Sequence, residues 1–419
     1  MSTAAKRPPE SVVALVPERE GVCIIAQNVG FGGMEVHTLG LMDALIARGH
    51  SIELVANHYA GYDELVKRPA WEGRFRLIHT DLGGILTGDR NDIAGWRRVF
   101  SELRSKVLLF PKGNYCYGQV RFLRECRRAF WRVIFIEHLE ATARPKGQTA
   151  LWWHKRRFIS KLGSRYADTI VAVSAKVKDR LVSDIGYPAS KVVVVRNGVP
   201  WQDFTYSDER GRAARARHHI AADSFVFGML TRLAPAKGID TALRALRLLE
   251  DRRADRNFSL VIAGDGYEAA KLMKLADELG IADRVKFLGF VDRPDEIVSA
   301  YDVILFSSRL EGLPLGLLEG MAAGCIPIVT RVSGMPEVVS SPDLGWTVAP
   351  EDPRDLCDAM ERVLTLDDRR RAELAMNVRR HVRENFDVRE SNRQMIESGL
   401  RSLNGPYPPA GDPALTEQN

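Results

Sequence analysis

Two glutamates eight residues apart, Glu311 and Glu319, flank a short run of glycine, proline and leucine. The run follows a predicted strand at Val303–Phe306, so Glu311 lies on a loop and Glu319 about one turn into the next predicted helix. A carboxylate among the apolar and small residues around Glu319 is unfavourable to bury unless it accepts hydrogen bonds. A sugar diol is a good pair of donors, so the pattern favours a ligand role for Glu319 over the alternative, a cap on a neighbouring loop.

Two cations, Arg232 and Lys237, directly follow a predicted strand at Val226–Leu230, at the point where a helix begins. An arginine can bind phosphate oxygens through two parallel hydrogen bonds, and a lysine adds a compact point charge, which suits a diphosphate. The alternative is a pair of solvated cations on a loop. Their place at the carboxyl end of a strand favours phosphate binding.

Two glycines, Gly32 and Gly33, follow a predicted strand at Val22–Ala26 and open a helix. Glycine lets the backbone pass close to a ligand, and a helix start offers free N–H groups to an anion. His138 lies at the carboxyl end of another predicted strand, Val133–Ile136. The alternatives are a plain strand-to-helix turn for the glycines and a surface position for the histidine.

Other chemistries have weaker support. Gly264-Asp265-Gly266 follows a predicted strand, but a third glycine and a well-placed ribose-binding acid are missing, which argues against a dinucleotide oxidoreductase. The carboxylates form no metal-binding cluster in the sequence, and none of the five cysteines belongs to a C-x-x-C pair. Free cysteines in apolar surroundings fit a reducing cytoplasmic compartment.

Predicted strands alternate with predicted helices through most of the 419 residues, which indicates right-handed β-α-β units around buried parallel sheets. A polar stretch at about 199–223 has no strand and marks the boundary between two domains of similar size. In such sheets ligands bind at the carboxyl ends of the strands, so two facing domains would hold a ligand in the cleft between them. The expected fold class is α/β, with two doubly wound parallel sheets.

The net charge of +6 is unevenly distributed. Residues 1–200 contain 31 Lys and Arg against 19 Asp and Glu, whereas residues 201–419 contain 29 against 35. A basic half favours an anionic partner, such as a phosphate-bearing substrate or acidic lipid. No nucleic-acid partner is expected, because no recognised RNA- or DNA-binding motif accompanies the basic residues. The longest apolar runs fall far short of the ~18 residues of a membrane-spanning helix, and we expect no secretory signal near the start.

Several segments, in order along the chain, resemble the family 4 retaining glycosyltransferases (glycosyl transferases group 1). They are GGMEVHTLGLMDALIARGH, LTRLAPAKGIDTALRAL, VKFLGFV, the Glu311/Glu319 pair and GMAAGCIPIVTRVSGMPEVV. The resemblance implies a GT-B fold, in which two Rossmann-like domains face each other across a cleft. We expect an acceptor-side domain at 1–200, a nucleotide-sugar-binding domain at 201–380, a helix at 381–403 that packs back on the first domain, and a disordered tail at 404–419.

The resemblance also implies an activity. A sugar would move from a UDP- or GDP-linked donor to a glycan or lipid-linked acceptor, with retention of configuration and without a metal or other cofactor. The implied pathway is the synthesis of surface polysaccharide, lipopolysaccharide or glycolipid. Two alternatives remain: a sugar-nucleotide epimerase of the same fold, and a non-catalytic carbohydrate- or nucleotide-binding module. The module is disfavoured because Arg232, Lys237, Glu311 and Glu319 are all present.

The resemblance assigns roles to single residues. Arg232 and Lys237 would hold the donor diphosphate, and Glu319 would bind the ribose hydroxyls. His138 and Glu311 would be the catalytic residues beside the transferred sugar. The remaining donor-binding residues would be Gly32 and Gly33 from the first domain and Gly312, Leu313, Pro314 and Leu315 from the second. The sequence departs from the family at Ser333-Gly334, where paired glycines are more common, and this leaves details of the sugar pocket open.

Two predicted helices of the first half combine basic and aromatic residues. Tyr117–Ala129 carries arginines at helical spacing, with Phe122, Cys126 and Phe130 on another face, and Leu151–Tyr166 carries Trp152 and Trp153 among lysines and arginines. This combination suits the headgroup region of an anionic bilayer. We therefore expect peripheral association with the cytosolic face of a membrane. The alternative is that both helices pack within the domain and their aromatic residues belong to the core.

Overall fold

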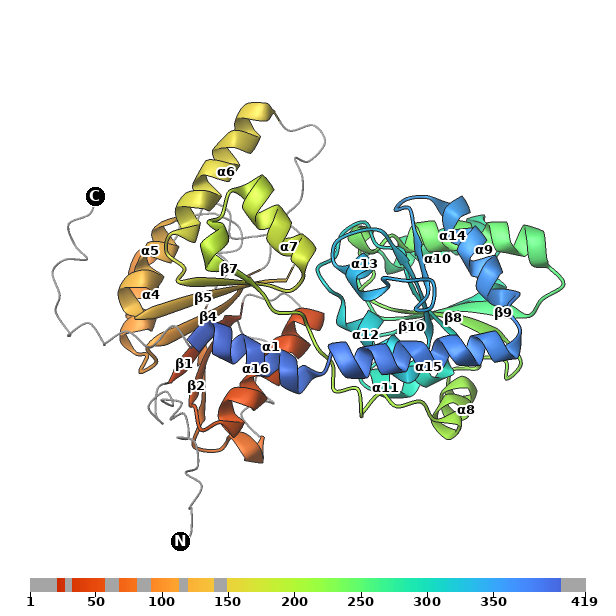
Figure 1. Cartoon of the computed structure of the whole chain (residues 1–419), viewed down its shortest axis with the longest axis horizontal. Coiled ribbons are helices and arrows are strands. Elements are labelled where there is room, and N and C mark those ends of the chain that lie inside the picture. Colours follow the sequence, from red (N-terminus) through yellow and green to blue (C-terminus); the bar gives the residue numbers. More distant parts are fainter. Residues whose placement is uncertain are drawn as a thin grey trace, which may run out of the picture.

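The computed structural model describes residues 21–26, 32–56, 68–80, 92–112, 120–138 and 149–400, which form two α/β domains lying side by side (Figure 1). Each domain is built on one sheet of parallel strands. The predicted α/β class with two doubly wound parallel sheets is therefore confirmed. The predicted tail at 404–419 lies outside the described residues.

The first sheet has seven strands in the order β3-β2-β1-β4-β5-β6-β7. The chain first adds strands on one side of β1 and then on the other, so the strand order reverses between β1 and β4. Central strands such as β1 and β5 are buried along their whole length, as expected when helices cover both faces of a parallel sheet. The strands are β1 (Val22–Ala26), β2 (Ile52–Ala56), β3 (Phe75–His79), β4 (Val107–Lys112), β5 (Arg132–Glu137), β6 (Thr169–Ala172) and β7 (Val192–Val194).

The described helices of the first domain cover the two faces of this sheet (Figure 1). Side-chain oxygens of Thr149 and Ser174 accept backbone N–H groups at the starts of α6 and α7, which fixes where these helices begin. A short π-helical turn, Leu181–Ile185, continues α7. The α-helices are α1 (Gly33–Ala47), α4 (Ile93–Ser101), α5 (Val120–Ala129), α6 (Ala150–Ser164) and α7 (Ala175–Arg180).

The second sheet has six strands in the order β10-β9-β8-β11-β12-β13, with the reversal between β8 and β11. The strands are β8 (Phe225–Leu230), β9 (Phe258–Ala263), β10 (Val285–Gly289), β11 (Val303–Phe306), β12 (Ile326–Thr330) and β13 (Trp346–Val348), the last of which was not predicted. The α-helices of this half are α8 (Asp208–Arg217), α9 (Ile239–Arg253), α10 (Ala269–Glu278), α11 (Pro294–Ile297), α12 (Leu315–Ala323), α13 (Met335–Val338), α14 (Pro353–Leu364) and α15 (Asp368–Asn385).

The chain passes between the domains twice, and the two passages run side by side. Val199 donates its N–H to the Phe386 carbonyl oxygen at 2.9 Å, and the Trp201 indole nitrogen donates to the Asp387 carboxylate at 3.0 Å. A Cβ atom at Gly198 would lie 2.7 Å from the Asp387 backbone, so only glycine allows this approach. The two passages form a paired hinge.

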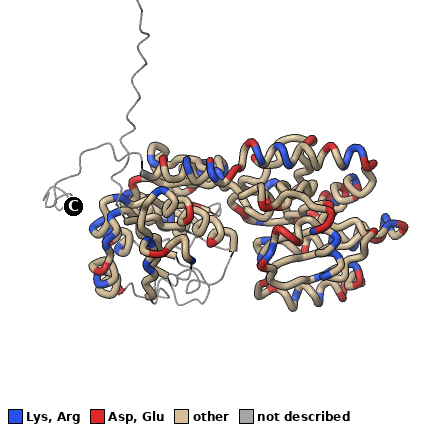
Figure 2. Tube along the Cα trace, turned by 90° about the horizontal axis from the view of Figure 1, so that it is seen from below, with Lys and Arg blue, Asp and Glu red and all other residues tan. Residues whose placement is uncertain are grey.

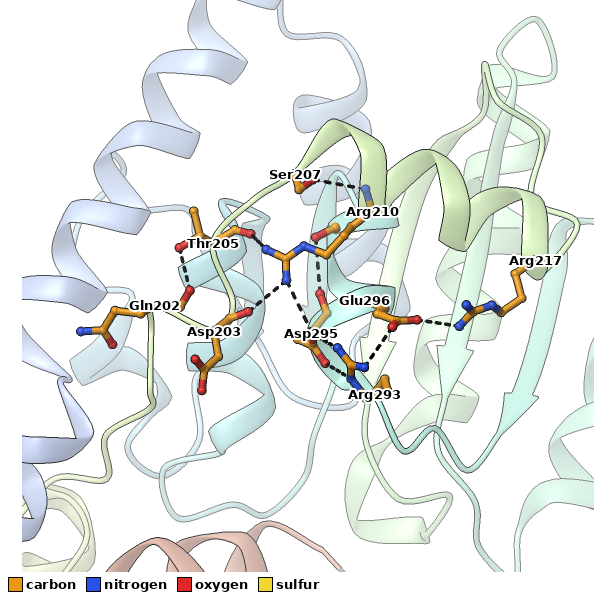
Figure 3. A network of polar contacts seen from close by, with 10 residues as sticks. Gln202, Asp203, Thr205, Ser207, Arg210, Arg217, Arg293, Asp295 and Glu296 are labelled. Atoms are coloured by element: carbon orange, nitrogen blue, oxygen red, sulfur yellow. Dashed lines mark hydrogen bonds and ion pairs between the residues drawn. The ribbon is translucent and has the colours of Figure 1, made fainter.

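The stretch at about 199–223, predicted as a polar boundary without a strand, contains the helix α8, which was not predicted. Its Arg210 donates a hydrogen bond to the Asp203 carbonyl oxygen at 3.2 Å, contacts the Thr205 carbonyl oxygen and lies 3.6 Å from the Asp295 carboxylate (Figure 3). This network fixes the chain to the second domain directly after the hinge.

The last described helix, α16 (Val388–Leu400), returns to the first domain (Figure 1). It packs on α1 and β6, where the Asn392 amide donates to the Gly40 carbonyl oxygen at 3.1 Å. The Ser391 hydroxyl donates to the Arg196 carbonyl oxygen at 2.6 Å. The first domain therefore includes a segment that follows the second domain in sequence.

The apolar face of α5 does not meet solvent, which corrects one part of the membrane prediction. Phe122, Cys126 and Phe130 are at most 2% exposed, and the Phe122 ring lies 4.8 Å from that of Trp96 on α4. These side chains fill the space between the helices and the sheet and cannot contact a bilayer. Acidic and basic residues are interspersed on the described parts of both domains (Figure 2). Within the described ranges, no helix is both long and apolar enough to cross a membrane.

Candidate active site

The loops after β8 and β11 lie together at the carboxyl end of the second sheet, at the point where the strand order reverses. Open α/β sheets bind ligands at such points. The first loop carries Arg232 and Lys237 and the second carries Glu311. A Cβ atom at Gly316 would lie 2.7 Å from the Leu230 carbonyl oxygen, so the first turn of α12 packs against the end of β8.

Lys237 and Glu311 form a buried ion pair. The Lys237 Nζ lies 2.7 Å from a Glu311 carboxylate oxygen, and the two side chains are 16% and 4% exposed. The Ser308 hydroxyl donates to the same oxygen at 2.8 Å. Gly238 has a φ of +60°, and its Cβ would lie 2.1 Å from the Ser307 carbonyl oxygen. Glycine at this position thus brings the two loops into contact.

Ser333 supports the Glu311 loop from the turn after β12. Its hydroxyl oxygen accepts the Glu311 N–H at 3.1 Å, although its own φ of +52° lies in the left-handed region that favours glycine. The hydrogen bond gives a physical reason for a serine where the family more often has glycine. The departure is visible in the sequence, whereas the bond depends on the packing of two loops.

Glu319 lies on α12 and is 8% exposed. Burial raises the pKa of its carboxyl group to about 7. No described residue donates a hydrogen bond to this carboxylate. A buried carboxylate without donors is in an unfavourable state that hydroxyl groups of a ligand would relieve.

The turn after β9, which resembled part of a dinucleotide fingerprint, packs on the Arg232 loop. Gly264 has a φ of +140°, and its Cβ would lie 1.9 Å from the Thr231 carbonyl oxygen. Leu233 donates its N–H to the Asp265 carbonyl oxygen at 2.9 Å. The glycine of this turn therefore permits close packing beside the candidate phosphate site.

The segment after Glu311 touches the first domain directly. A Cβ atom at Gly312 would lie 1.8 Å from the His138 carbonyl oxygen, and the Asn197 amide donates to the Leu313 carbonyl oxygen at 2.8 Å. Pro314 precedes the first turn of α12, and Leu315 is buried. The structure therefore brings Gly312 and His138, predicted from opposite halves of the sequence, into contact.

Arg232 also faces the first domain. A Cβ atom at Gly32 would lie 3.6 Å from the Arg232 Nε and 3.3 Å from a Glu35 carboxylate oxygen. Arg232 is exposed, and its guanidinium forms no ion pair with any described residue. Burial raises the pKa of the Glu35 carboxyl group to about 7, although backbone hydrogen bonding and Arg232 oppose the shift. Gly33 opens α1 with no atom within 4 Å of its Cβ position, and the preceding residues 27–31 lie outside the described part.

Sequence analysis missed His37, which lies beside His138. The two imidazole centroids are 4.9 Å apart with an interplanar angle of 75°, and both side chains are buried. Burial lowers the pKa of His37 to about 4. Burial, and secondarily His37, hold the pKa of His138 well below its usual value. The position of His37 one helical turn after the predicted site residue Gly33 is a sequence signal that could have identified it as a candidate site residue.

A second missed residue, Glu337 on α13, joins the domains. Its carboxylate oxygens accept the N–H groups of Ala175 at 3.1 Å and Lys176 at 2.8 Å, at the start of α7. Arg196 Nε lies 3.7 Å from the same carboxylate. Among the described residues, no group of three His, Cys, Asp or Glu side chains has an arrangement that could hold a metal ion.

Two parallel-sheet domains that meet at the carboxyl ends of their strands have the GT-B architecture. Residues 212–381 match the family described as Glycosyl transferases group 1, and residues 31–202 match Glycosyltransferase Family 4. The chain belongs to this glycosyltransferase family and is an enzyme of the transferase class. The predicted family is thereby confirmed.

Individual similarities agree with this assignment. The D-inositol 3-phosphate glycosyltransferase 2 of Catenulispora acidiphila is 32% identical over 358 residues, which are 80% of this chain and 82% of the relative. The solved structure of Anabaena Alr3699/HepE in complex with UDP and glucose matches with a TM-score of 0.75 at 19% identity, covering 92% of this chain and 100% of that chain. WaaG, a glycosyltransferase involved in lipopolysaccharide biosynthesis, matches with a TM-score of 0.68 at 16% identity, covering 90% and 99%. The two structural matches show the GT-B fold.

Proposed function

We propose that this protein transfers a sugar from a UDP- or GDP-linked donor to a glycan or lipid-linked acceptor, with retention of configuration. The observation that carries the proposal is the arrangement of Arg232, the Lys237–Glu311 pair and Glu319 around one strand reversal that faces His138. The proposed pathway is the synthesis of surface polysaccharide, lipopolysaccharide or glycolipid, and the lipopolysaccharide enzyme WaaG shares the fold.

Each site residue has a distinct proposed role. Arg232 and Lys237 neutralise the donor diphosphate, and Glu319 accepts hydrogen bonds from the ribose diol. Glu311 and His138 are the proposed catalytic residues beside the transferred sugar. Gly32 and Gly33 allow the first domain to approach the donor. The backbone from Gly312 through Leu313 and Pro314 to Leu315 closes the other side of the pocket.

The proposed retention follows from attack on the same face of the sugar as the departing diphosphate. Fixed cations stabilise the charge that develops on this leaving group as its bond to the sugar breaks. The leaving phosphate oxygen takes the proton of the acceptor hydroxyl as the new bond forms. Closing of the two domains, which already touch between Gly312 and His138, over the donor would exclude water from the reacting centre and limit hydrolysis of the donor.

A panel of nucleotide sugars tests the proposed function. Binding is measured by thermal shift with UDP, GDP and their glucose, galactose, mannose and N-acetylglucosamine derivatives, and turnover by release of nucleotide with and without acceptor glycans. We expect one base to stabilise the protein and its sugar donor to be consumed with retention. Sugar epimerisation without transfer would support the epimerase instead, and no binding by any nucleotide would refute the donor site.

Transfer is expected to persist in excess chelator. The reason is that Arg232 and Lys237 supply positive charge where a divalent ion would otherwise neutralise the diphosphate. The measurement is the initial transfer rate with and without EDTA. A rate abolished by EDTA and restored by Mg²⁺ or Mn²⁺ would contradict the assignment.

We also propose that the first domain docks on the cytosolic face of an anionic membrane through α6, which extends from the body of that domain (Figure 1). Leu151 and Phe158 are 79% and 68% exposed, and Trp152 is exposed beside them. Lys155 and Lys161 on the same helix are also exposed. Apolar side chains next to cations suit the headgroup region, where each cation contributes about 1 kcal/mol.

Co-sedimentation with vesicles measures this docking. The protein is expected to bind phosphatidylglycerol vesicles but not phosphatidylcholine vesicles, with less binding as salt rises. The L151D/F158D double variant should lose binding, whereas M273D, at an exposed apolar position on α10, should keep it. Salt-independent binding, or equal loss in both variants, would exclude α6 as the docking surface.

A further inference from the structure

His37 and His138 form a buried pair of imidazoles between α1 and the end of β5. They are 6% and 8% exposed, and their rings meet in an edge-to-face geometry with centroids 4.9 Å apart. Neither ring nitrogen of His37, nor Nε2 of His138, has a hydrogen-bond partner among the described residues. The pair thus keeps several polar atoms unpaired inside the first domain.

Such an arrangement is unfavourable for the fold alone. A buried polar atom without a partner destabilises a protein by about 1–3 kcal/mol. The first turns of α1 bury the polar residues Glu35, His37 and Thr38, whereas the side chains buried in the rest of the helix are apolar: Leu41, Met42, Leu45 and Ile46. An apolar residue at position 37 would continue that face without the penalty, so the histidine serves a purpose other than packing.

The location of the pair indicates that purpose. The backbone carbonyl oxygen of His138 lies against Gly312 of the second domain. A Cβ atom on Gly312 would lie only 1.8 Å from this oxygen. His37 follows Gly32 and Gly33 by about one helical turn. The histidine pair therefore lies behind the surface at which the first domain meets the proposed donor pocket.

We propose that His37 is a positioning residue that holds the His138 ring in one orientation toward the transferred sugar. The proposal rests on the proposed glycosyltransferase site. The edge-to-face contact restricts rotation of the His138 ring, because both rings are buried and packed against each other with centroids 4.9 Å apart. A fixed ring presents one nitrogen to a sugar hydroxyl, and misplacement of a reacting group lowers the rate strongly.

The charge of the pair fits the same role. Burial lowers the pKa of both rings, so both imidazoles are neutral at pH 7. The transition state of glycosyl transfer places positive charge on the sugar ring. A neutral His138 can hydrogen-bond to a hydroxyl of that sugar without adding a repelling cation.

Two variants of similar size separate positioning from packing. His37→Leu fills the space without a ring, whereas His37→Phe keeps an aromatic ring against His138. With the donor identified by the nucleotide panel, we expect H37L to lower kcat about 10- to 100-fold with the donor KM little changed, and H37F to retain most of the rate. The active fraction is normalised by nucleotide binding, so partial unfolding does not imitate the effect.

A spectroscopic measurement tests the orientation without turnover. In protein with ¹⁵N-labelled histidine rings, the His138 signals are assigned by their loss in H138Q. We expect one sharp set of His138 ring signals in the wild type and in H37F, and signals broadened by exchange between ring orientations in H37L. Wild-type kcat in H37L, equal loss in H37L and H37F, or an unchanged His138 spectrum in H37L would each overturn the proposal. If the wild type transfers no sugar, the proposed function fails, but the spectra still decide the positioning role.

Discussion

Replacing Glu319 with glutamine is expected to weaken nucleotide binding and at the same time stabilise the unliganded protein. The carboxylate is buried, and no described residue donates a hydrogen bond to it. Glutamine is uncharged, so it cannot offer the two ribose hydroxyls the ionised acceptor that a carboxylate provides. Hydrogen bonds to charged groups contribute about 1.5–3 kcal/mol each. We therefore expect calorimetry with UDP or GDP to show affinity at least about tenfold lower in E319Q.

The stabilisation has a defined pH dependence. The pKa of Glu319 rises from 4.5, its value in an unfolded chain, to about 7 in the folded protein. The folded state therefore binds the proton more tightly, and stability is lost as pH rises from 4.5 through 7. Glutamine does not ionise, so E319Q should be more stable by about 3 kcal/mol at pH 8 and by almost nothing below pH 4.5.

Chemical denaturation at pH 8 and pH 4.5 measures this difference. E278Q is the matched control, because Glu278 is an exposed carboxylate on α10. Its stability should follow the wild type at both pH values. An E319Q protein that binds nucleotide with wild-type affinity, or shows no gain at pH 8, would contradict the role of Glu319 as a carboxylate held ready for a ligand.

Replacing Lys237 with methionine is expected to remove donor binding and to destabilise the fold. Methionine keeps most of the side-chain volume but leaves Glu311 as a buried carboxylate without its cation. Breaking a buried ion pair on one side typically destabilises a protein by about 3–5 kcal/mol. From the sequence alone, with Lys237 read as a loop cation, we would expect weaker binding without a stability change. Because Lys237 pairs with the buried Glu311, we expect a loss of stability in addition to weaker binding.

A double-mutant cycle separates the two effects. The K237M/E311Q protein no longer contains an unpaired buried charge, so it should recover most of the lost stability but none of the nucleotide affinity. K271M is the control, because Lys271 forms an exposed pair with Glu268. Wild-type binding of UDP and GDP by K237M, or no recovery of stability in the double variant, would disprove this account.

The strands and the strand-end loops could be predicted from sequence because they depend on local patterns. The buried strands Val22–Ala26 and Val303–Phe306 have the predicted bounds, since continuous apolar runs are typical of central parallel strands. The sequence predicted that Lys237 and Glu311 each lie on a loop after a strand, whereas the contact between these loops follows from the neighbouring position of β8 and β11 in the sheet. The pairing between them depends on side-chain geometry, which the sequence does not specify.

Features that depend on tertiary contact were missed or misread. α8 consists of six charged residues with three alanines and one glycine and so has no apolar stripe of large side chains. Arg210 and Arg215 fix it to the second domain through contacts with residues far along the chain. Phe122 and Phe130 occur beside arginines, and this pattern is also typical of helices that lie on a membrane surface. In the structure, α4 and the sheet bury both phenylalanines. The role of His37 was missed because its partner, His138, lies about one hundred residues away in the sequence.

The position of α16 has a consequence for synthesis on the ribosome. The helix that covers α1 and β6 is translated only after the whole second domain, so the nascent first domain exposes that surface while the rest of the chain emerges. The first domain therefore cannot complete its packing until residues 388–400 have been translated. Expression of the first domain alone would leave the surface permanently uncovered, and a co-expressed peptide of α16 would be the simplest way to restore it.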